Sequence, residues 1–389
     1  MTVAELPHSP GVGFRLFGAP PLRVLAARLH LPHPRWRRMN ALWLVLFAWF
    51  PLLLLSTLEQ RVFAGQRPFY TDFAVHARLF VMLPVLLLGK EVADRMFGRA
   101  MDFLVASGAV TAAMRFEFDR RLQRFTRWRD AWPALILLVV LAYALSRLEY
   151  DVPANRLYSW RTRPDLELTA AGYWYFLVAR PLVLIHLLSW LWTFALWVWL
   201  LASLLHMPLR LLAFHPDRHG GLEPVLVAHR VFVLLSFAIG ADLGGSLANR
   251  MVHAHEPFAM YRMTLIVIVA VLTVVLLAPL FLLTRPLLPA YLDALEEYGA
   301  MGSELSRLMQ RESIAALHRG VDEPMKSLIT AHKDSGNALE RIAGTHIVPF
   351  TRHYVLSFLL APIIPIALAT LTRIPLSTVI ERLRSLFLH

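Results

Sequence analysis

Seven apolar stretches, each about as long as a lipid bilayer is thick, limit what this chain can fold into. A bilayer core of about 30 Å requires roughly 20 mainly apolar residues per crossing helix, and backbone groups in lipid must be satisfied within the segment itself. Continuous runs of this kind predict helices, whereas a membrane barrel shows short alternating segments. We therefore expect an all-α polytopic membrane protein with spans at residues 40–58, 76–97, 132–148, 173–207, 225–249, 262–283 and 354–371.

Charged residues affect the expected ends of the second span, and an Arg-Pro pair affects the expected continuity of the fourth. Arg78 begins the second span near the expected outer surface, where a long side chain can reach water, and Lys90 and Glu91 indicate where that span leaves the lipid. The fourth span is too long for one perpendicular crossing, and Arg180-Pro181 interrupts its first part because proline lacks a helical amide donor. We interpret residues 173–180 as an interfacial piece followed by the true span; one strongly tilted helix is the alternative.

The distribution of basic residues predicts the orientation. Arginine and lysine gather in the N-terminal segment, in the loop after the second span and between the sixth and seventh spans. Short loops rich in these residues tend to stay in the cytoplasm, so we expect a cytoplasmic N-terminus. The excess of arginine over lysine suggests a GC-rich bacterial genome, and hence the bacterial inner membrane. Topology and attraction to anionic membrane lipids account for the net charge of +12, so no nucleic-acid partner is expected.

The chain divides into four expected parts. Residues 1–39 form a basic cytoplasmic segment, 40–285 a six-span membrane domain, 286–350 a cytoplasmic helical hairpin, and 351–389 a proline-broken last membrane segment with an amphipathic C-terminal helix.

The expected hairpin is indicated by apolar residues that recur at spacings of three and four over residues 288–309. They pack either against a neighbouring helix at 324–342 or against another subunit in a coiled coil. Residues 288–342 are therefore a candidate binding surface for a cytoplasmic partner. The basic stretch 102–130 is either a helix at the lipid surface or a solvated topology anchor.

Asp242 is the strongest candidate functional residue within a span, because a charge in lipid is costly and usually has a role. It lies between Gly240 and Gly244, which share a helix face and permit close approach of another helix. Its carboxylate is a candidate ion ligand or proton acceptor; the structural alternative is an ion pair between helices, with Arg180 as partner. His186 is a further candidate for the ion path, or a satisfied interior histidine.

The most distinctive local string is the turn between the fourth and fifth spans, residues 214–222. His215, Pro216, Asp217, Gly220 and Gly221 predict a compact cytoplasmic turn, since proline fixes its own φ and glycine accepts positive φ. The favoured role of Asp217 is to cap the following helix or to pair with a loop arginine.

Histidines give this turn a second interpretation. His215, Asp217 and His219 offer imidazole and carboxylate ligands for a cation such as zinc, with His206 and His229 on the flanking helices. Their spacing does not match a recognised zinc motif, so the structural turn is preferred and no cofactor is expected.

The last apolar segment contains Pro362 and Pro365. Broken helices at membrane depth often border a substrate site in transporters, and a kinked packing helix is the alternative.

The chain resembles an uncharacterised group of bacterial multi-pass inner-membrane proteins in two features. One is a Trp-rich fourth span that runs into His215-Pro216-Asp217-Arg218 and Gly220-Gly221-Leu222, and the other is the proline-interrupted last segment. The resemblance covers most of the chain and implies the fold and the turn, but no activity. His219 stands where that group has a small residue, which argues against a histidine-based metal site.

Enzyme motifs are missing from the sequence: it has no phosphate-binding glycine loop, no His-Glu-x-x-His helix and no Gly-x-Ser-x-Gly turn.

We favour a channel or transporter for a small ion or solute, assembled as a homo-oligomer and gated by its cytoplasmic helices. The alternative is a non-transporting membrane scaffold or sensor that binds a cytoplasmic partner. An intramembrane enzyme that uses the histidines of the turn is the third hypothesis.

Overall fold

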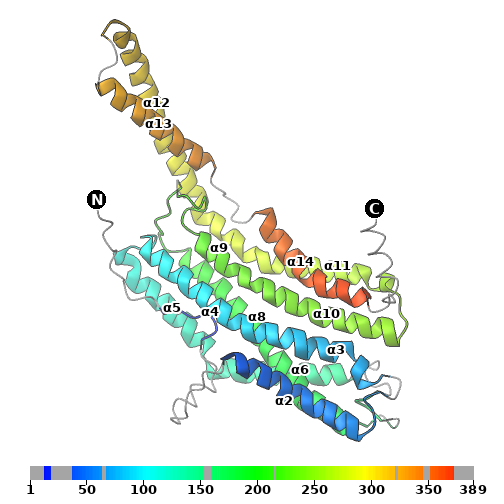
Figure 1. The fold of residues 1–389 in the computed structure, drawn as a ribbon. Helices are drawn as coiled ribbons and strands as arrows, with labels where there is room; N and C mark the ends of the chain where they lie inside the picture. Colours follow the sequence, from blue (N-terminus) through cyan, green and yellow to red (C-terminus); the bar gives the residue numbers. More distant parts are fainter. Residues whose placement is uncertain are drawn as a thin grey trace, which may run out of the picture.

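The computed structural model describes residues 13–18, 37–63, 67–151, 159–163, 165, 167–213, 215–319, 323–344 and 351–371. Seven of its helices are long and apolar enough to cross a membrane, which confirms the predicted all-α polytopic fold. The spans lie side by side in one bundle, and a long helical hairpin projects beyond one end of it (Figure 1).

All seven predicted spans correspond to helices. The first, third and last spans are single helices: α2 (Arg37–Leu58), α6 (Trp132–Asp151) and α14 (Arg352–Thr370). The other four are runs of consecutive helical segments: α3 (Phe73–His76), η2 (Ala77–Met82) and α4 (Leu83–Ala106); α7 (Ala170–Trp174), η5 (Tyr175–Ala179) and α8 (Arg180–Leu204); α9 (Glu223–His229), η6 (Arg230–Phe232) and α10 (Val233–His253); α11 (Arg262–Leu277), η8 (Ala278–Leu283) and α12 (Thr284–Arg319).

The fourth span is helical without a break from Ala170 to Leu204, so the interruption expected at Arg180-Pro181 is wrong. The segment is one helix, as in the single-helix alternative, and its strong tilt stays a prediction. The π-helical segment η5 comes directly before Arg180-Pro181. A π-helical turn alters the hydrogen-bond register locally, so the chain can absorb a residue without an amide donor and remain helical. Lys90 of the second span is half-buried and donates to Ser189 Oγ on α8 at 2.8 Å, so it packs between helices. The exit of this span into water at Lys90 and Glu91 stays a prediction.

The last span is also unbroken over its described residues. Pro362 and Pro365 lie inside α14, which packs along α10 and α11. The predicted break is therefore wrong, and the segment is a packing helix, as the alternative states; the kink expected in it stays a prediction. The predicted amphipathic C-terminal helix and most of the basic segment 1–39 lie outside the described residues.

The basic stretch after the second span forms the helix α5 (Arg115–Arg129), which packs against α8. Phe118, Leu122 and Phe125 are buried on this inner face, whereas Phe116 is 78% exposed. The helix is thus attached to the bundle through an apolar stripe, and its arginines lie on the remaining faces.

The projecting hairpin consists of α12 and α13 (Glu323–Ala343), which pack against each other within the chain (Figure 1). Gly302 of α12 faces Leu339 of α13: a Cβ at this glycine would lie 3.3 Å from Leu339 Cδ1. The intramolecular alternative for the apolar seam is therefore confirmed.

Candidate functional site

Arg78 is the centre of a buried ionic network in one half of the bundle. Its Nε donates to Asp242 Oδ1 at 2.5 Å, and one terminal nitrogen donates to Glu149 Oε1 at 2.8 Å and to the Tyr175 hydroxyl at 2.6 Å. The Arg78 side chain is only 9% exposed. One guanidinium thus connects the second span to α6, η5 and α10, which are separate in sequence.

Arg180 belongs to the same network but has a different partner from the one expected. Its Nε donates to Glu149 Oε2, and Asp242 pairs with Arg78 instead. Because α6 packs against α8, Glu149 lies within reach of Arg180, whereas Asp242 on α10 faces the second span. The two arginines and two carboxylates balance in charge, which is the condition under which buried ions are tolerated.

A second carboxylate, Asp72, lies just before α3 and is 6% exposed. It accepts hydrogen bonds from Trp160 Nε1 and Asn249 Nδ2, both at 2.8 Å, from the backbone amide of Val75 at 3.2 Å, and from the guanidinium of Arg161. Burial by itself raises the pKa of Asp72, but Arg161 and these hydrogen bonds outweigh it and hold the pKa well below its ordinary value. Asp72 is therefore a stable anion that anchors the loop carrying Trp160 and Arg161.

Tyr175 connects the two groups. Its hydroxyl accepts from Arg78, and the Arg161 guanidinium carbon lies 4.4 Å from its ring centroid. Beside Asp72 is a polar cavity of about 30 Å³, lined by Arg67, Asp72, Ser159, Arg161, Asn249 and His253. A cavity of this size has room for roughly one or two water molecules. The network therefore runs continuously from this cavity to Asp242.

Gly240 and Gly244 face α14, away from the ionic network. A Cβ at Gly240 would lie 2.4 Å from Pro362 Cα, and one at Gly244 would lie 2.6 Å from the Pro365 carbonyl oxygen. Asp242 is two residues from each glycine and so projects from the other side of α10. The close approach predicted for the glycines is confirmed, with the last span as the partner, but the glycines do not accompany Asp242 into its site.

His186 also lies apart from the network. It is half-buried six residues after Arg180 on α8, and its Nδ1 is 2.9 Å from the Leu182 carbonyl oxygen, one turn back. This contact is that of a satisfied interior histidine, the structural alternative for this residue.

The turn after the fourth span is organised by Asp217. Its carboxylate accepts from the backbone amides of His219 at 2.9 Å, Gly221 at 3.1 Å and Glu223, the first residue of α9, at 3.2 Å. Burial alone raises the pKa of Asp217, but these amide donors outweigh it and the pKa is lowered. Gly220 adopts a φ of 65° and Gly221 a φ of 90°, values that favour glycine. Asp217 thus accepts from the first amide of α9, as the predicted capping role requires, although Leu222 occupies the N-cap position itself; Pro216 is exposed.

The histidines near this turn do not converge on one point. His215 Nδ1 lies 2.8 Å from Asp217 Oδ1, whereas His219 Nδ1 lies 2.7 Å from the backbone carbonyl of Asp217. His229 is buried elsewhere: its Nδ1 accepts from Trp197 Nε1 at 3.0 Å and its Nε2 is 2.8 Å from the Leu276 carbonyl oxygen. Among the described residues, no group of three or more His, Asp or Glu side chains is arranged to hold a metal ion.

Sequence reasoning missed most of the network. It placed Arg78 near the surface and gave no role to Asp72, Glu149, Tyr175 or Arg161. One signal was available, since an arginine within an apolar span requires a buried anion, and both Glu149 and Asp242 lie in or at the end of other spans. The chain matches no protein-family model, no curated protein and no solved structure.

Proposed function

We propose that this protein is a membrane-embedded scaffold or sensor that presents the α12–α13 hairpin to a cytoplasmic partner. The observation that carries the proposal is the continuity of the sixth span with the hairpin: the chain is helical without interruption from Arg262 to Arg319. At 1.5 Å per residue the contour of this helical path is roughly 85 Å, far longer than a bilayer core of about 30 Å. A displacement of the sixth span within the membrane would be transmitted through the continuous helix to the hairpin.

Exposed apolar side chains on the hairpin support a role in binding. Leu295, Met301 and Leu308 of α12 are 39%, 45% and 38% exposed, and Ile329 of α13 is 41% exposed. Exposed apolar groups on a helix that projects from a membrane domain are typical of a surface that another protein covers, for example with an amphipathic helix.

The ionic network supports the proposal because it fixes the arrangement of the membrane spans from which the hairpin projects. Asp242 is bonded to Arg78 and Glu149 to both Arg78 and Arg180, so these charges hold four spans in one arrangement. A carboxylate that binds a permeating ion has to exchange its protein partner for that ion. The geometry around Asp242 therefore favours the scaffold over the channel.

Transport is the second candidate, because ionisable groups inside membrane spans often form ion or proton pathways. Arg78, Glu149 and Asp242 are the groups concerned. Protonation of a carboxylate would release Arg78 and rearrange the spans that it connects. In this hypothesis a homo-oligomer supplies the pore.

Site-specific photo-crosslinking in intact membranes tests the scaffold. Photo-reactive residues at Met301 and Leu308 are expected to capture the same soluble protein. Val267 and Val271, which are 60% and 56% exposed on α11, are matched control positions expected to give no such product. Adducts only with lipid or with the chain itself from all four positions would reject the proposal.

Flux measurements test the alternative. The full chain in proteoliposomes is expected to carry no ion or proton flux above that of empty vesicles. A flux that Asp242→Asn changes by an order of magnitude or more, with the protein still folded, would instead establish transport through this network.

A further inference from the structure

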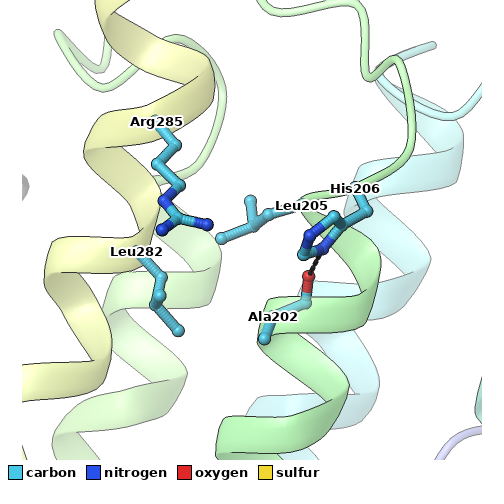
Figure 2. Close-up of a pocket in the computed structure, with 5 residues that line it drawn as sticks. All are labelled: Ala202, Leu205, His206, Leu282 and Arg285. Carbon is cyan, nitrogen blue, oxygen red and sulfur yellow. Dashed lines mark hydrogen bonds between the residues drawn. The ribbon is translucent and has the colours of Figure 1, made fainter.

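A cleft lies where the fourth and sixth spans end on the predicted cytoplasmic side. It has a volume of about 90 Å³ and is lined by Ala202, Leu205 and His206 at the end of the fourth span, by Leu282 in η8 and by Arg285 at the start of α12. Figure 2 shows the Arg285 guanidinium pointing into the gap toward Leu205 and His206, with Leu282 and Ala202 one helical turn below. The cleft thus has a cationic part at Arg285 and an apolar part, one helical turn away, at Leu282 and Ala202.

The helices that line the cleft expose apolar side chains along their spans. Leu191 and Trp199 of α8 are 40% and 36% exposed, and Val274 of α11 and Phe281 of η8 are 66% and 53% exposed. In a bilayer such exposed side chains face acyl chains. Because the cleft lies at the ends of two spans, we expect it to open at the boundary between the hydrocarbon region and the headgroups.

The polar groups of the cleft are suited to an anion. Arg285 is exposed and forms no ion pair with any residue that the structure describes. His206 Nδ1 lies 2.6 Å from the Ala202 carbonyl oxygen, to which it donates, so its Nε2 is left as an acceptor for a hydroxyl of the headgroup beside the phosphate. A guanidinium forms paired hydrogen bonds with phosphate oxygens, and basic pockets between spans on the cytoplasmic side recognise lipid headgroups.

We propose that this cleft binds one anionic phospholipid. Arg285 holds the phosphate, His206 contacts the headgroup, and an acyl chain lies along Leu282 and Ala202. Because Arg285 is the second residue of α12, the bound lipid touches the helix that carries the hairpin. The lipid site stands independently of any hairpin partner.

Native mass spectrometry of the full chain in neutral detergent tests the proposal, with phosphatidylglycerol or phosphatidylcholine added at equal concentration. The unmodified protein is expected to retain phosphatidylglycerol in preference. Arg285→Gln is expected to lower that retention about fivefold, the effect of removing one arginine near a headgroup. Arg262→Gln is the matched control: it removes an exposed arginine from the opposite end of the same helical run and is expected to retain the lipid.

Two further measurements separate this site from simple charge attraction. Ala202→Phe fills the cleft without changing its charge and is expected to reduce retention as Arg285→Gln does. Excess inorganic phosphate is expected to leave the lipid bound, because the acyl-chain contact is absent from free phosphate. Equal retention by Arg285→Gln and Arg262→Gln, equal retention of both lipids, full retention by Ala202→Phe, or displacement by free phosphate would each overturn the assignment.

Discussion

Arg78 and Asp242, 164 positions apart in the chain, are joined inside the bundle by a 2.5 Å hydrogen bond between Arg78 Nε and Asp242 Oδ1. The same guanidinium bonds to Glu149 and Tyr175, so its removal takes one donor from each of three acceptors, and Arg180 remains as a donor to Glu149. Arg78 is thus the charge that neutralises Asp242. The effects on stability of substitutions at these two residues should therefore depend on each other.

Arg78→Gln is expected to be strongly destabilising. Breaking a buried ion pair by removal of one partner typically costs 3–5 kcal/mol, because the remaining charge is left uncompensated. Thermal unfolding in detergent should show the loss. Asp242→Asn in the Arg78→Gln background should then cost less than Asp242→Asn alone, since the two residues are coupled.

Arg120→Gln is the control for this comparison. Arg120 is 55% exposed and pairs with Glu117 on the surface of α5, where an ion pair contributes about 0–1 kcal/mol. Equal losses for Arg78→Gln and Arg120→Gln would contradict the role assigned to the buried network.

Gly240→Ala is expected to destabilise the contact between α10 and α14 by about 1–3 kcal/mol, the usual cost of overpacking. The new methyl group would meet the backbone of Pro362, which cannot move aside as a flexible side chain can. Unfolding midpoints of the purified variants measure the effect.

Gly299→Ala provides the opposite case in the same protein. Gly299 lies in α12 with open space around its Cβ position, so alanine should stabilise the helix by about 0.5–1 kcal/mol. If both alanine variants shift the midpoint in the same direction, the close packing at Gly240 does not govern its response.

Acidification is expected to loosen the loop around Trp160. The folded-state pKa of Asp72 is lowered, so its contribution to stability is fully present above the unfolded pKa of about 3.9 and is lost as pH falls below it. Amide hydrogen exchange at Trp160 and Thr169, corrected for the intrinsic pH dependence of exchange, should therefore quicken below about pH 4.

Asp72→Asn is expected to abolish most of this acid response, because an amide does not titrate. Its loop should exchange faster already at neutral pH, where the ion pair with Arg161 is missing. An acid response of unchanged size in Asp72→Asn would assign the effect to another group.

Asp217→Ala is expected to cost about 0.5–2 kcal/mol, the usual range for loss of a helix cap. Its carboxylate accepts from three backbone amides of the turn and of α9, and alanine accepts from none. Accelerated exchange at Gly221 and Glu223 would locate the loss.

Arg218→Gly is the counterpart within the same turn. Arg218 has a φ of 58°, which glycine adopts without strain, so this variant should keep the stability and the exchange rates of the turn. A loss as large as that of Asp217→Ala would show that the Arg218 side chain, and not the backbone conformation, matters there.

Local features of the site were accessible from the sequence, and long-range ones were not. The turn at Asp217 depends on residues within seven positions of one another, so proline, aspartate and paired glycines were sufficient to predict it. The pairing of Arg180 with Glu149 depends on which helices are neighbours, and the choice of Asp242 as the partner of Arg180 failed for that reason.

The sequence by itself determined the number, the positions and the helical state of the membrane spans. Those properties follow from the length of each apolar run and from the need to satisfy backbone groups in lipid, and both requirements act within a single segment. Only the tertiary structure decided that α14 lies in the groove formed by Gly240 and Gly244, and that Arg78 serves Asp242 and Glu149 together. These pairings arise when separate helices pack, because shape and charge have to match across residues that the chain order does not bring together.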